Sequence, residues 1–388
     1  MHVDVIIVGG GLAGTALAVA LRSAKLSVAL VEGKVPTRTA GWDARIYAIS
    51  PANAHFLESI GIWSHLDRAR LQAVEHMSIY GDTDGRLQFS AYDSGIGELA
   101  WICESSLLQC ELWESVKRQA NVQLFCPARP AAMTINADQV TLQLDDGRQM
   151  TCALLVGADG ADSWVRQSAG IDAIQRPYDQ LGVVANFETE KPHDNTAFQW
   201  FRGSDVLAWL PLPGKRISMV WSIATEPGRD LIQCDAEEFS QRVEQVGAAR
   251  LGKLSLMAAP AAFPLRLMRA RQSAQARLVL IGDAAHAIHP LSGHGINLGF
   301  QDAASLADVL LQKPEYQDCG SLALLRRHER ARKEEVLALQ TVTDTLHRLF
   351  QAPADPLAPW VSVRNIGMNV TNQLPLLKDL LVRYALAS

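Results

Sequence analysis

The sequence lacks the features that mark several protein classes. Its six cysteines include no C-x-x-C pair, which excludes zinc ribbons and thioredoxin-like redox motifs. Internal repeats and low-complexity tracts are absent. Lysine and arginine number 36 against 41 acidic residues, so the net charge is −5, whereas general nucleic-acid binding usually needs a basic face. We therefore expect no nucleic-acid partner.

A long apolar segment is also missing. An uncharged stretch runs from Val5 to Leu21, but Asp4 precedes it and four glycines interrupt it. A membrane span needs about 20 apolar residues. We expect neither a signal peptide nor a membrane span, and hence a cytoplasmic protein whose reduced cysteines act as small buried hydrophobic residues.

The composition that remains is that of a globular protein. Of the 388 residues, 48% are hydrophobic and 20% are charged, which excludes a disordered chain, a collagen-like repeat and a disulfide-rich miniprotein. At roughly 150 residues per domain, this length predicts two to three domains with a large core.

The first 32 residues predict a nucleotide-binding unit. A buried strand from Val3 to Val8 leads into Gly9-Gly10-Gly11-Leu12-Ala13-Gly14, which fits G-x-G-x-x-G. A predicted helix from Thr15 to Ala24 follows, and then a strand from Ser27 to Val31 that ends at Glu32. This order of elements is typical of a dinucleotide site, with a purely structural glycine turn as the alternative.

Each part of this unit has a physical reason. The first glycine permits a tight turn, the second lets the backbone approach a pyrophosphate at the helix N-terminus, and the third lets the helix pack close to the strand. Glu32 can accept hydrogen bonds from an adenosine ribose, which argues against a 2′-phosphate and favours FAD or NAD over NADP in this pocket. The predicted contacts are Gly9, Gly11, Leu12, Ala13, Gly14 and Glu32.

Two later segments repeat the pattern of a buried strand followed by a Gly/Asp turn. The segment 154–166 contains Asp159-Gly160, and the segment 278–302 contains Gly282-Asp283 followed by His289-Pro290 and Gly293-His294-Gly295-Ile296-Asn297. A carboxylate at the end of a strand, as at Asp283, can accept hydrogen bonds from a ligand hydroxyl or can cap the following helix.

The three motifs, in this order, resemble those of the single-component flavin-dependent aromatic hydroxylases, and 289–302 resembles the ubiquinone-biosynthesis branch of that family. Asp43-Ala44-Arg45 and Arg364-Asn365 extend the resemblance over nearly the whole chain. It implies an α/β fold, α+β overall: a Rossmann-like FAD-binding domain with an inserted antiparallel-sheet substrate domain, as in p-hydroxybenzoate hydroxylase. It also implies FAD as cofactor and NADPH or NADH as a transient reductant.

The resemblance assigns roles around the flavin. Gly282 and Asp283 would hold the ribityl chain, and Gly293 and Gly295 would let the backbone approach the ring. The backbone of Ile296 and Asn297 would place a helix N-terminus near N1 and the C2 oxygen, where reduced flavin is negative. The carbonyl of Pro290 would lie near C4a.

Further roles concern the phosphates. Asp159 and Gly160 would contact the pyrophosphate side of FAD and help to bind NAD(P)H, while Asp162 and Ser163 are better explained as helix caps. Arg45 would contact FAD, with a simple surface arginine as the alternative.

The histidines leave two interpretations open. His286, His289 and His294 lie close enough to suggest a metal site, but carboxylate or thiolate ligands at usual spacing are missing, so we expect no metal. His289 and His294 are candidate bases for a phenol. The sequence departs from the family at His294, usually Gln, and at Ser105 and Ser106, often Asn-Arg, to which we assign no flavin contact.

The activity that the resemblance implies is hydroxylation of a polyprenylated phenol in ubiquinone biosynthesis. NAD(P)H reduces FAD, O₂ forms a flavin C4a-hydroperoxide, and its distal oxygen goes to the ring. The alternatives are a prenyl reductase, a halogenase, whose W-x-W-x-I-P motif is absent, and a non-catalytic FAD-binding subunit of a biosynthetic complex.

The predicted domains are discontinuous. The FAD-binding domain comprises 1–75, 100–177 and 270–330, the sheet domain 76–99 and 178–269, and a helical region 331–388. Six aromatic residues of the sheet domain are expected in its core or, individually, in a substrate pocket: Phe187, Phe198, Trp200, Phe201, Trp209 and Trp221.

The C-terminal region predicts one helix from Glu329 to Thr345 and an apolar one from Leu374 to Leu386. The second is either a packing helix or a surface that docks to a membrane or a partner, which suits a lipid-tailed substrate. Peripheral contact with the inner membrane and with other ubiquinone-biosynthesis proteins is therefore expected on this second interpretation. The sequence leaves homo-oligomerisation open.

Overall fold

The computed structural model describes residues 1–288, 295–351, 365, 368–369 and 371–373. Four predicted site residues, His289, Pro290, Gly293 and His294, lie outside the described residues, as does the predicted helix 374–386.

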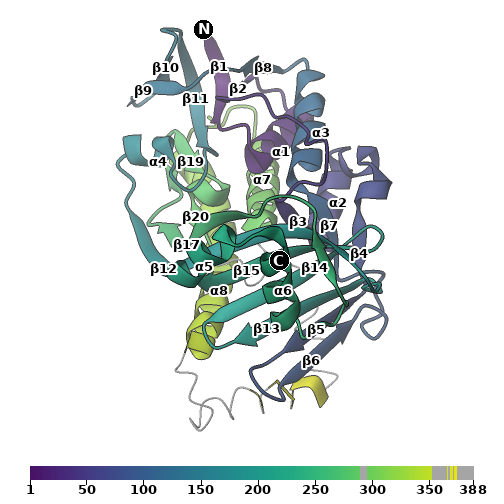
Figure 1. Ribbon diagram of the computed structural model, residues 1–388. Coiled ribbons are helices and arrows are strands. Elements are labelled where there is room, and N and C mark those ends of the chain that lie inside the picture. Colours follow the sequence, from purple (N-terminus) through teal and green to yellow (C-terminus); the bar gives the residue numbers. More distant parts are fainter. Residues whose placement is uncertain (289–294, 352–364, 366–367, 370, 374–388) are drawn as a thin grey trace.

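The upper part of the molecule in Figure 1 is a largely parallel sheet. Its strands run in the order β18, β19, β11, β1, β2, β8, and β10 and β9 extend it from β11 as antiparallel neighbours. The strands are β1 (His2–Val8), β2 (Val28–Val31), β8 (Val122–Phe125), β9 (Pro130–Ile135), β10 (Val140–Leu144), β11 (Gln149–Gly157), β18 (Ala274–Gln275) and β19 (Leu278–Leu280).

Continuous apolar sequences form the centre of this sheet. Strand β1 lies between β2 and β11, parallel to both, and its residues from Val5 to Val8 are buried on both faces, as parallel strands usually are. Helices α1 (Leu12–Ala20), α3 (Ser105–Lys117) and α7 (Gly295–Leu311) pack together against one face. The α-helix predicted to reach Ala24 ends earlier, at Ala20, and a 3₁₀ turn over Leu21–Ser23 follows it.

The lower part is a nine-stranded sheet that meets the first sheet at an angle (Figure 1). Its main order is β20, β17, β12, β15, β14, β13, β5, β6, with β16 beside β12. Its strands are β5 (His76–Tyr80), β6 (Arg86–Ser90), β12 (Ala173–Thr189), β13 (Thr196–Arg202), β14 (Asp205–Leu212), β15 (Arg216–Ala224), β16 (Leu254–Leu256), β17 (Ala261–Ala270) and β20 (His286–Ala287).

The two faces of this lower sheet differ because side chains alternate along each strand. One face carries the aromatic residues Phe187, Phe198, Trp200, Trp209 and Trp221, in a core covered by α5 (Thr225–Gln233) and α6 (Ala236–Val246). The other face turns toward the parallel sheet.

A small third sheet joins the two. It consists of β3 (Ile46–Ile49), β7 (Ala100–Glu104) and β4 (Gln72–Val74), with β7 in the middle. Helix α2 (Pro51–Ser59) follows β3, and the Ser50 side chain caps it by accepting a hydrogen bond from the Asn53 backbone. The short helix α4 (Trp164–Ser168) lies after β11.

The long helix α8 (Leu322–Gln351) includes the helix predicted over Glu329–Thr345 and packs on α7. Beyond it, three asparagines of the C-terminal region lie along β6, the edge strand of the lower sheet. The Oδ1 atoms of Asn365, Asn369 and Asn372 accept hydrogen bonds from the backbone N–H groups of Gly85 (3.1 Å), Arg86 (2.9 Å) and Gln88 (2.9 Å).

The α/β fold with an antiparallel second sheet is the one predicted. Strands β5 and β6, which belong to the predicted segment 76–99, pair with strands of 178–269. Strand β12 continues through the predicted boundary at 177, and β20, from 270–330, pairs with β17. The domain boundaries themselves stay predictions.

Candidate cofactor and substrate site

A cavity of about 1370 Å³ lies between the two large sheets. It begins at the carboxyl ends of β1, β2, β11 and β19 and reaches the inner face of the lower sheet. All predicted cofactor residues within the described ranges line it, except Gly14. The structure therefore brings together residues from three separate motifs.

The first glycine turn has the geometry that its sequence predicts. Gly9 has φ +105°, and a Cβ there would lie 2.3 Å from the carbonyl oxygen of Ala158. A Cβ at Gly14 would lie 2.0 Å from the Gly9 oxygen, so this glycine serves close packing beneath the cavity. A Cβ at Gly11 would meet no atom within 4 Å, which leaves its backbone open to a ligand.

Glu32 braces this turn from the end of β2. Its Oε2 accepts a hydrogen bond from the Gly10 N–H (2.7 Å) and its Oε1 one from Lys34 (3.0 Å). Since a carboxylate offers about four acceptor positions, capacity remains for a ribose hydroxyl. The side chain lines the cavity, and the ribose contact remains a prediction.

The Asp43–Arg45 loop is fastened to the N-terminus of α3. The Asp43 carboxylate accepts hydrogen bonds from the backbone N–H groups of Arg45 and Ser106 (2.9 Å each), and the Ser105 N–H donates to the Arg45 carbonyl (2.9 Å). Ser105 and Ser106 hold the loop through their backbone N–H groups. These backbone contacts do not depend on which side chains occupy the two positions. Arg45 is exposed and lines the cavity. This placement is compatible with a contact to FAD and also with a simple surface arginine.

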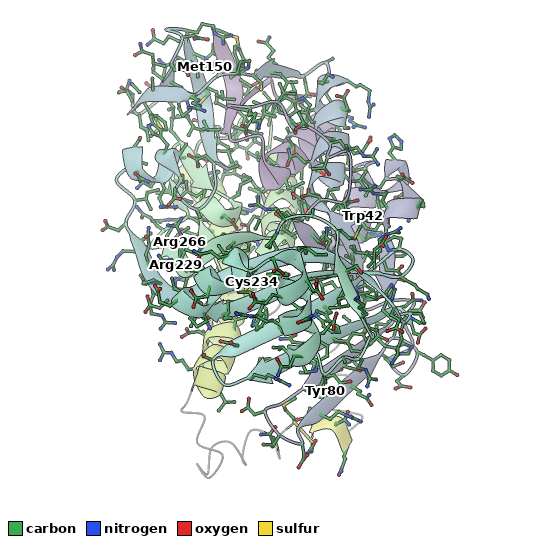
Figure 2. All side chains as sticks on the ribbon, in the orientation of Figure 1. Trp42, Tyr80, Met150, Arg229, Cys234 and Arg266 are labelled. Carbon is green, nitrogen blue, oxygen red and sulfur yellow. The ribbon has the colours of Figure 1, made fainter. Side chains whose placement is uncertain are left out.

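A buried ion pair supports the same loop. Glu104 accepts two hydrogen bonds from the Arg70 guanidinium (2.6 Å each) and one from the Asp43 N–H (2.7 Å). The Arg70 guanidinium also lies 4.1 Å from the centre of the Trp42 ring, on the side of the molecule where β3, β4 and β7 lie (Figure 2). The bidentate ion pair with Glu104 and the stacking on Trp42 fix the position of the Arg70 guanidinium. Glu104, held in this way, fixes the start of the loop at Asp43.

The second motif places an unpaired carboxylate oxygen at the cavity. Oδ2 of Asp159 accepts a hydrogen bond from Val165 N–H (3.0 Å), while Oδ1 is buried without a partner in the described part of the chain. Ser163 caps α4 as predicted. The cap prediction for Asp162 is wrong, because Ser163 is the N-cap of α4 and the Asp162 carboxylate instead pairs with Arg266 of β17 (2.6 Å; Arg266 is labelled in Figure 2).

Arg166 joins the second motif to the third. Its guanidinium donates to the carbonyls of Ala284 (2.9 Å) and Ala161 (2.9 Å). Burial lowers its pKa, although the group stays cationic at neutral pH. The turns that carry Asp159 and Asp283 are thus held at a fixed separation.

Asp283 lies in a 3₁₀ turn over Gly282–Ala284 and caps no helix, so that alternative is wrong. The Asp283 side chain is exposed to the cavity. The protein that surrounds the cavity at this point keeps bulk water away from the carboxyl group, and this burial raises its pKa. The nearby charges of His286 and Arg45 oppose that increase. A hydroxyl donor in the cavity would favour the ionised form.

Asp302 supports this turn from below. Its Oδ2 accepts hydrogen bonds from the Gly282 N–H (2.9 Å) and His286 Nε2 (2.6 Å), and its Oδ1 one from Arg332 Nε of α8 (2.7 Å). Burial opposes its ionisation, but these cationic and hydrogen-bonding partners prevail and lower the pKa of the Asp302 carboxyl. The sequence analysis did not find this role.

The N-terminus of α7 also lies at the cavity, through Gly295, Ile296 and Asn297. The Asn297 side chain faces away into the protein, where it accepts from Ser50 N–H (3.0 Å) and donates to the Ala48 carbonyl (2.8 Å). Asn297 therefore contributes its backbone to the cavity, and a 17-residue helix directs its positive end there.

The other half of the cavity is apolar. The lower sheet lines it with Met77, Phe89, Val184, Ala197, Gln199, Ala208, Leu210, Val220, Ala261 and Phe263. None of the six aromatic residues predicted for core or pocket lies here, since five belong to the core under α5 and α6, and Phe201 packs with Ile79, Val206 and Met368.

Sequence reasoning missed the residues of this apolar half, together with Tyr47, which lines the cavity near Arg45 and Asp283. A usable signal existed on β13. Because Phe198 and Trp200 share one face, Ala197 and Gln199 must share the other.

Within the described residues, no group of three or more histidine, cysteine or acidic side chains is placed to hold a metal ion. All six cysteines are free, and three of them, Cys103, Cys152 and Cys319, are buried. In the same described part, no helix is both long and apolar enough to cross a bilayer.

Comparisons with known proteins agree with this geometry. The "FAD binding domain" family model matches residues 2–342. The chain is 33% identical to ubiquinone hydroxylase UbiL of Rhodospirillum rubrum, over 99% of this chain and 90% of that protein. It is 30% identical to 3-demethoxyubiquinol 3-hydroxylase of Escherichia coli, over 99% and 98%.

A solved structure shows the same fold. The chain is similar to p-nitrophenol 4-monooxygenase PnpA of Pseudomonas putida with a TM-score of 0.81 and 17% identity, covering 100% of this chain and 99% of that one. The family match spans the three motifs that meet at the cavity, and the two relatives above extend over nearly the whole chain. The chain therefore belongs to the FAD-dependent monooxygenases, in the family that includes the ubiquinone hydroxylases.

Proposed function

We propose that this enzyme hydroxylates the aromatic ring of a polyprenylated phenol in ubiquinone biosynthesis, using NADPH or NADH and O₂. The observation that carries the proposal is the continuous cavity, which joins a glycine- and carboxylate-lined end to an apolar end. The names of the relatives, a ubiquinone hydroxylase and a 3-demethoxyubiquinol 3-hydroxylase, support the choice of substrate.

The residues at the first end fit FAD. The open backbone at Gly11, the unpartnered Asp159 oxygen and the cavity-facing Asp283 carboxylate match a pyrophosphate turn and a hydroxyl-rich ribityl chain. The proposed contacts are Gly9, Gly11, Leu12, Ala13, Glu32, Arg45, Asp159, Gly160, Gly282, Asp283, Gly295, Ile296 and Asn297. Gly14 supports them by packing, and Gly293 remains a sequence-based proposal.

When bound, FAD accepts a hydride from NAD(P)H and activates O₂ so that one oxygen atom reaches the ring. The N-terminus of α7 would stabilise negative charge on the reduced ring. Apolar side chains of the lower sheet would exclude water, which protects a reactive oxygen species from decay. His289 and His294 remain candidate bases and Pro290 a candidate backbone contact, all from sequence alone.

A polyprenyl chain also bears on location. Such a chain partitions into a bilayer, so we include peripheral contact with the inner membrane in the proposal. Cytoplasmic exposure of the rest of the enzyme follows from the need to take up NAD(P)H.

The test is turnover by the purified protein after reconstitution with FAD. We expect a prenylated phenol to stimulate both NAD(P)H oxidation and O₂ uptake, and mass spectrometry to find a product heavier by one oxygen atom. Reductant consumption without O₂ uptake would instead indicate a prenyl reductase. FAD binding without any stimulation would indicate a non-catalytic subunit.

The ring position can be found in cells. Expression in strains that each lack one quinone hydroxylation step should remove the accumulated intermediate in the strain whose step this enzyme performs.

A further inference from the structure

We infer that one edge of the lower sheet docks this enzyme on an anionic bilayer, beside the apolar half of the cavity. The surface consists of an apolar edge, 256–264, and a basic cluster at its start, Lys191, Lys215, Arg250 and Lys253. The inference rests on the proposed function, which requires contact with a bilayer and leaves open which face makes it. It differs from the docking segment predicted from sequence, 374–386, which lies outside the described residues.

The apolar edge is the first observation. Every residue of 256–264 is apolar, in the order Leu-Met-Ala-Ala-Pro-Ala-Ala-Phe-Pro. Ala258, Ala259 and all residues of 261–264 are exposed. Globular proteins rarely keep a continuous apolar strip in water unless it serves a contact. The strip therefore indicates a surface that something apolar covers.

The apolar edge is the outermost strand of the lower sheet at this point. On one side its residues pair with β12. On the other side β20 reaches only Met268 and Arg269, so 256–264 has no strand beyond it in the described part of the chain. Strands β17 and β6 lie at opposite sides of the sheet (Figure 1), and the side at β6 is the one that the asparagines close.

The same strand is a wall of the cavity. Ala261 and Phe263 line the cavity, whereas Ala262 and Pro264 point to the opposite face and are exposed there, because side chains alternate along a strand. Phe263 itself is 38% exposed. A single strand thus separates the apolar half of the cavity from the outside. A prenyl chain that leaves the cavity beside Phe263 would enter whatever covers this edge.

The basic cluster adjoins the start of the apolar edge. The Glu190 N–H donates to the Lys253 carbonyl (3.0 Å), and Lys215 Nζ donates to the Glu190 carbonyl (3.0 Å). Lys191 follows Glu190 in the chain, and Arg250 shortly precedes Lys253. All four cations are exposed. With the one carboxylate of Glu190 among them, the cluster carries a net positive charge.

The two features lie along one line. Leu254, next to Lys253, pairs with Thr189 of β12, and Phe263 pairs with Gly182 of the same strand. At about 3.4 Å per residue, the part of β12 between these two pairs is roughly 24 Å long. Cations at one end and apolar side chains along the rest fit a bilayer with anionic head groups.

Two prolines argue against a protein strand as the occupant. Pro260 and Pro264 have no N–H group, and prolines on an edge hinder pairing with a further strand. Lipid needs no hydrogen bond from the edge, whose other backbone groups can stay hydrated at the level of the head groups. We therefore assign the surface to a bilayer and not to a second copy joined through this edge.

The experiment measures flotation of the wild-type holoenzyme with two kinds of vesicle. One kind is phosphatidylcholine alone, and the other is phosphatidylcholine with an equal part of phosphatidylglycerol. We expect binding to the anionic vesicles to be at least about tenfold tighter and to weaken as salt is added. Equal binding to the two kinds would overturn the role of the basic cluster.

Charge reversal tests the basic cluster. Lys191→Glu combined with Lys253→Glu should weaken binding to the anionic vesicles by at least about thirtyfold. The control is Lys25→Glu combined with Lys117→Glu, two exposed lysines of the parallel-sheet part, which changes the net charge equally. Because distant charges are screened, the control should change binding by less than about threefold.

A separate substitution tests the apolar edge. Ala262→Asp, on the outer face and away from the cavity lining, should weaken vesicle binding by at least about fivefold. The control is Ala132→Asp, an exposed alanine on β9, which is an edge strand of the other large sheet. FAD content equal to that of wild type shows that a variant folds. An equal loss in the control would overturn the assignment.

The outcomes separate this inference from the proposed function, if a geranylated phenol is also supplied in detergent micelles. Hydroxylation of the phenol by a wild type that floats with neither kind of vesicle would leave the proposed function standing and this inference wrong. If the phenol fails to stimulate NAD(P)H oxidation while the flotation results hold, the proposed function is wrong and the docking surface stands.

Two further results would overturn the inference. Vesicle binding that persists in Ala262→Asp and in the lysine variant would assign docking to another segment, such as 374–386. A wild-type dimer that Ala262→Asp dissociates would assign the edge to a second copy of the chain.

Discussion

Among the residues of the cavity, Asp283 combines an open carboxylate with deep placement. It accepts no hydrogen bond from the described part of the chain, while its turn is held by Asp302 from below and by Arg166 from the side. Such a carboxylate is fixed in position before any ligand arrives. Pre-organisation of this kind lowers the entropy lost on binding.

At the residue scale we therefore predict that Asp283→Ala weakens FAD binding by roughly ten- to a hundredfold, the usual value of one or two hydrogen bonds to a charged group. Titration of the apoprotein with FAD, followed by quenching of flavin fluorescence, measures it. Asp146→Ala is the matched control, since this exposed carboxylate lies in the turn between β10 and β11, away from the cavity. Unchanged affinity in Asp283→Ala would refute its assigned role.

At the scale of elements, the edge of the lower sheet is closed by side chains instead of a further strand. An edge strand presents free N–H groups that can pair with another chain. On β6 and the residue before it, three of these groups donate to the asparagines at 365, 369 and 372. Spacings of four and three residues place all three on one side of a helical turn.

We predict that Asn365→Ala combined with Asn369→Ala exposes this edge. Hydrogen exchange followed by mass spectrometry should show faster exchange at the amides of Gly85 and Arg86, while those of β14 and β15, inside the sheet, stay protected. Unaltered exchange at Gly85 and Arg86 would mean that other contacts hold the edge.

The elements also show what the sequence could predict. The sequence predicted strands β1, β11 and β19 and the glycine turns because their signals are local. Each strand is a run of apolar residues, and each is followed by a turn that contains glycine or by an acidic residue. The asparagine contacts were not, because they join residues some 280 positions apart. The lining of the apolar half could be predicted only in part. The alternation of side chains on β13 was visible in the sequence, but which face packs against α6 and which faces the cavity depends on the tertiary structure.

At the scale of the whole molecule, α8 fastens the C-terminal region to the cofactor end through a buried charged cluster. Arg332 of α8 binds Asp302 of α7 and donates to the Gln301 side chain (2.8 Å). His328, one turn earlier on α8, contacts the Ser305 hydroxyl (3.0 Å). Burial lowers the pKa of His328 to about 4, and the carboxylate of Asp302 opposes this only in part.

This cluster predicts an acid sensitivity of the entire fold. An unfolded histidine has a pKa near 6.5, so the unfolded chain takes up a proton at His328 before the folded chain does. The stability contribution is therefore complete above about pH 6.5 and falls as the pH decreases toward 4. At pH 5 the loss is about 2 kcal/mol.

Urea denaturation of the holoenzyme at pH 7 and pH 5, with saturating FAD, measures this dependence. His328→Gln should reduce the difference between the two pH values, whereas His55→Gln, an exposed histidine on α2, should not. A wild-type difference that persists in His328→Gln would place the sensitivity elsewhere.

The order of strands in the parallel sheet has a consequence for synthesis on the ribosome. Strand β1 emerges first, yet its neighbour β11 brings Leu154 beside Val5, and β19 brings Leu278 beside Leu155. The glycine turn after β1 is therefore made early, and one side of β1 stays unpaired until β11 has been translated. One side of β11 in turn stays unpaired until β19 has been translated. A nascent chain in this state exposes a long apolar strand, so we expect chaperones to occupy it and FAD to be loaded only after release.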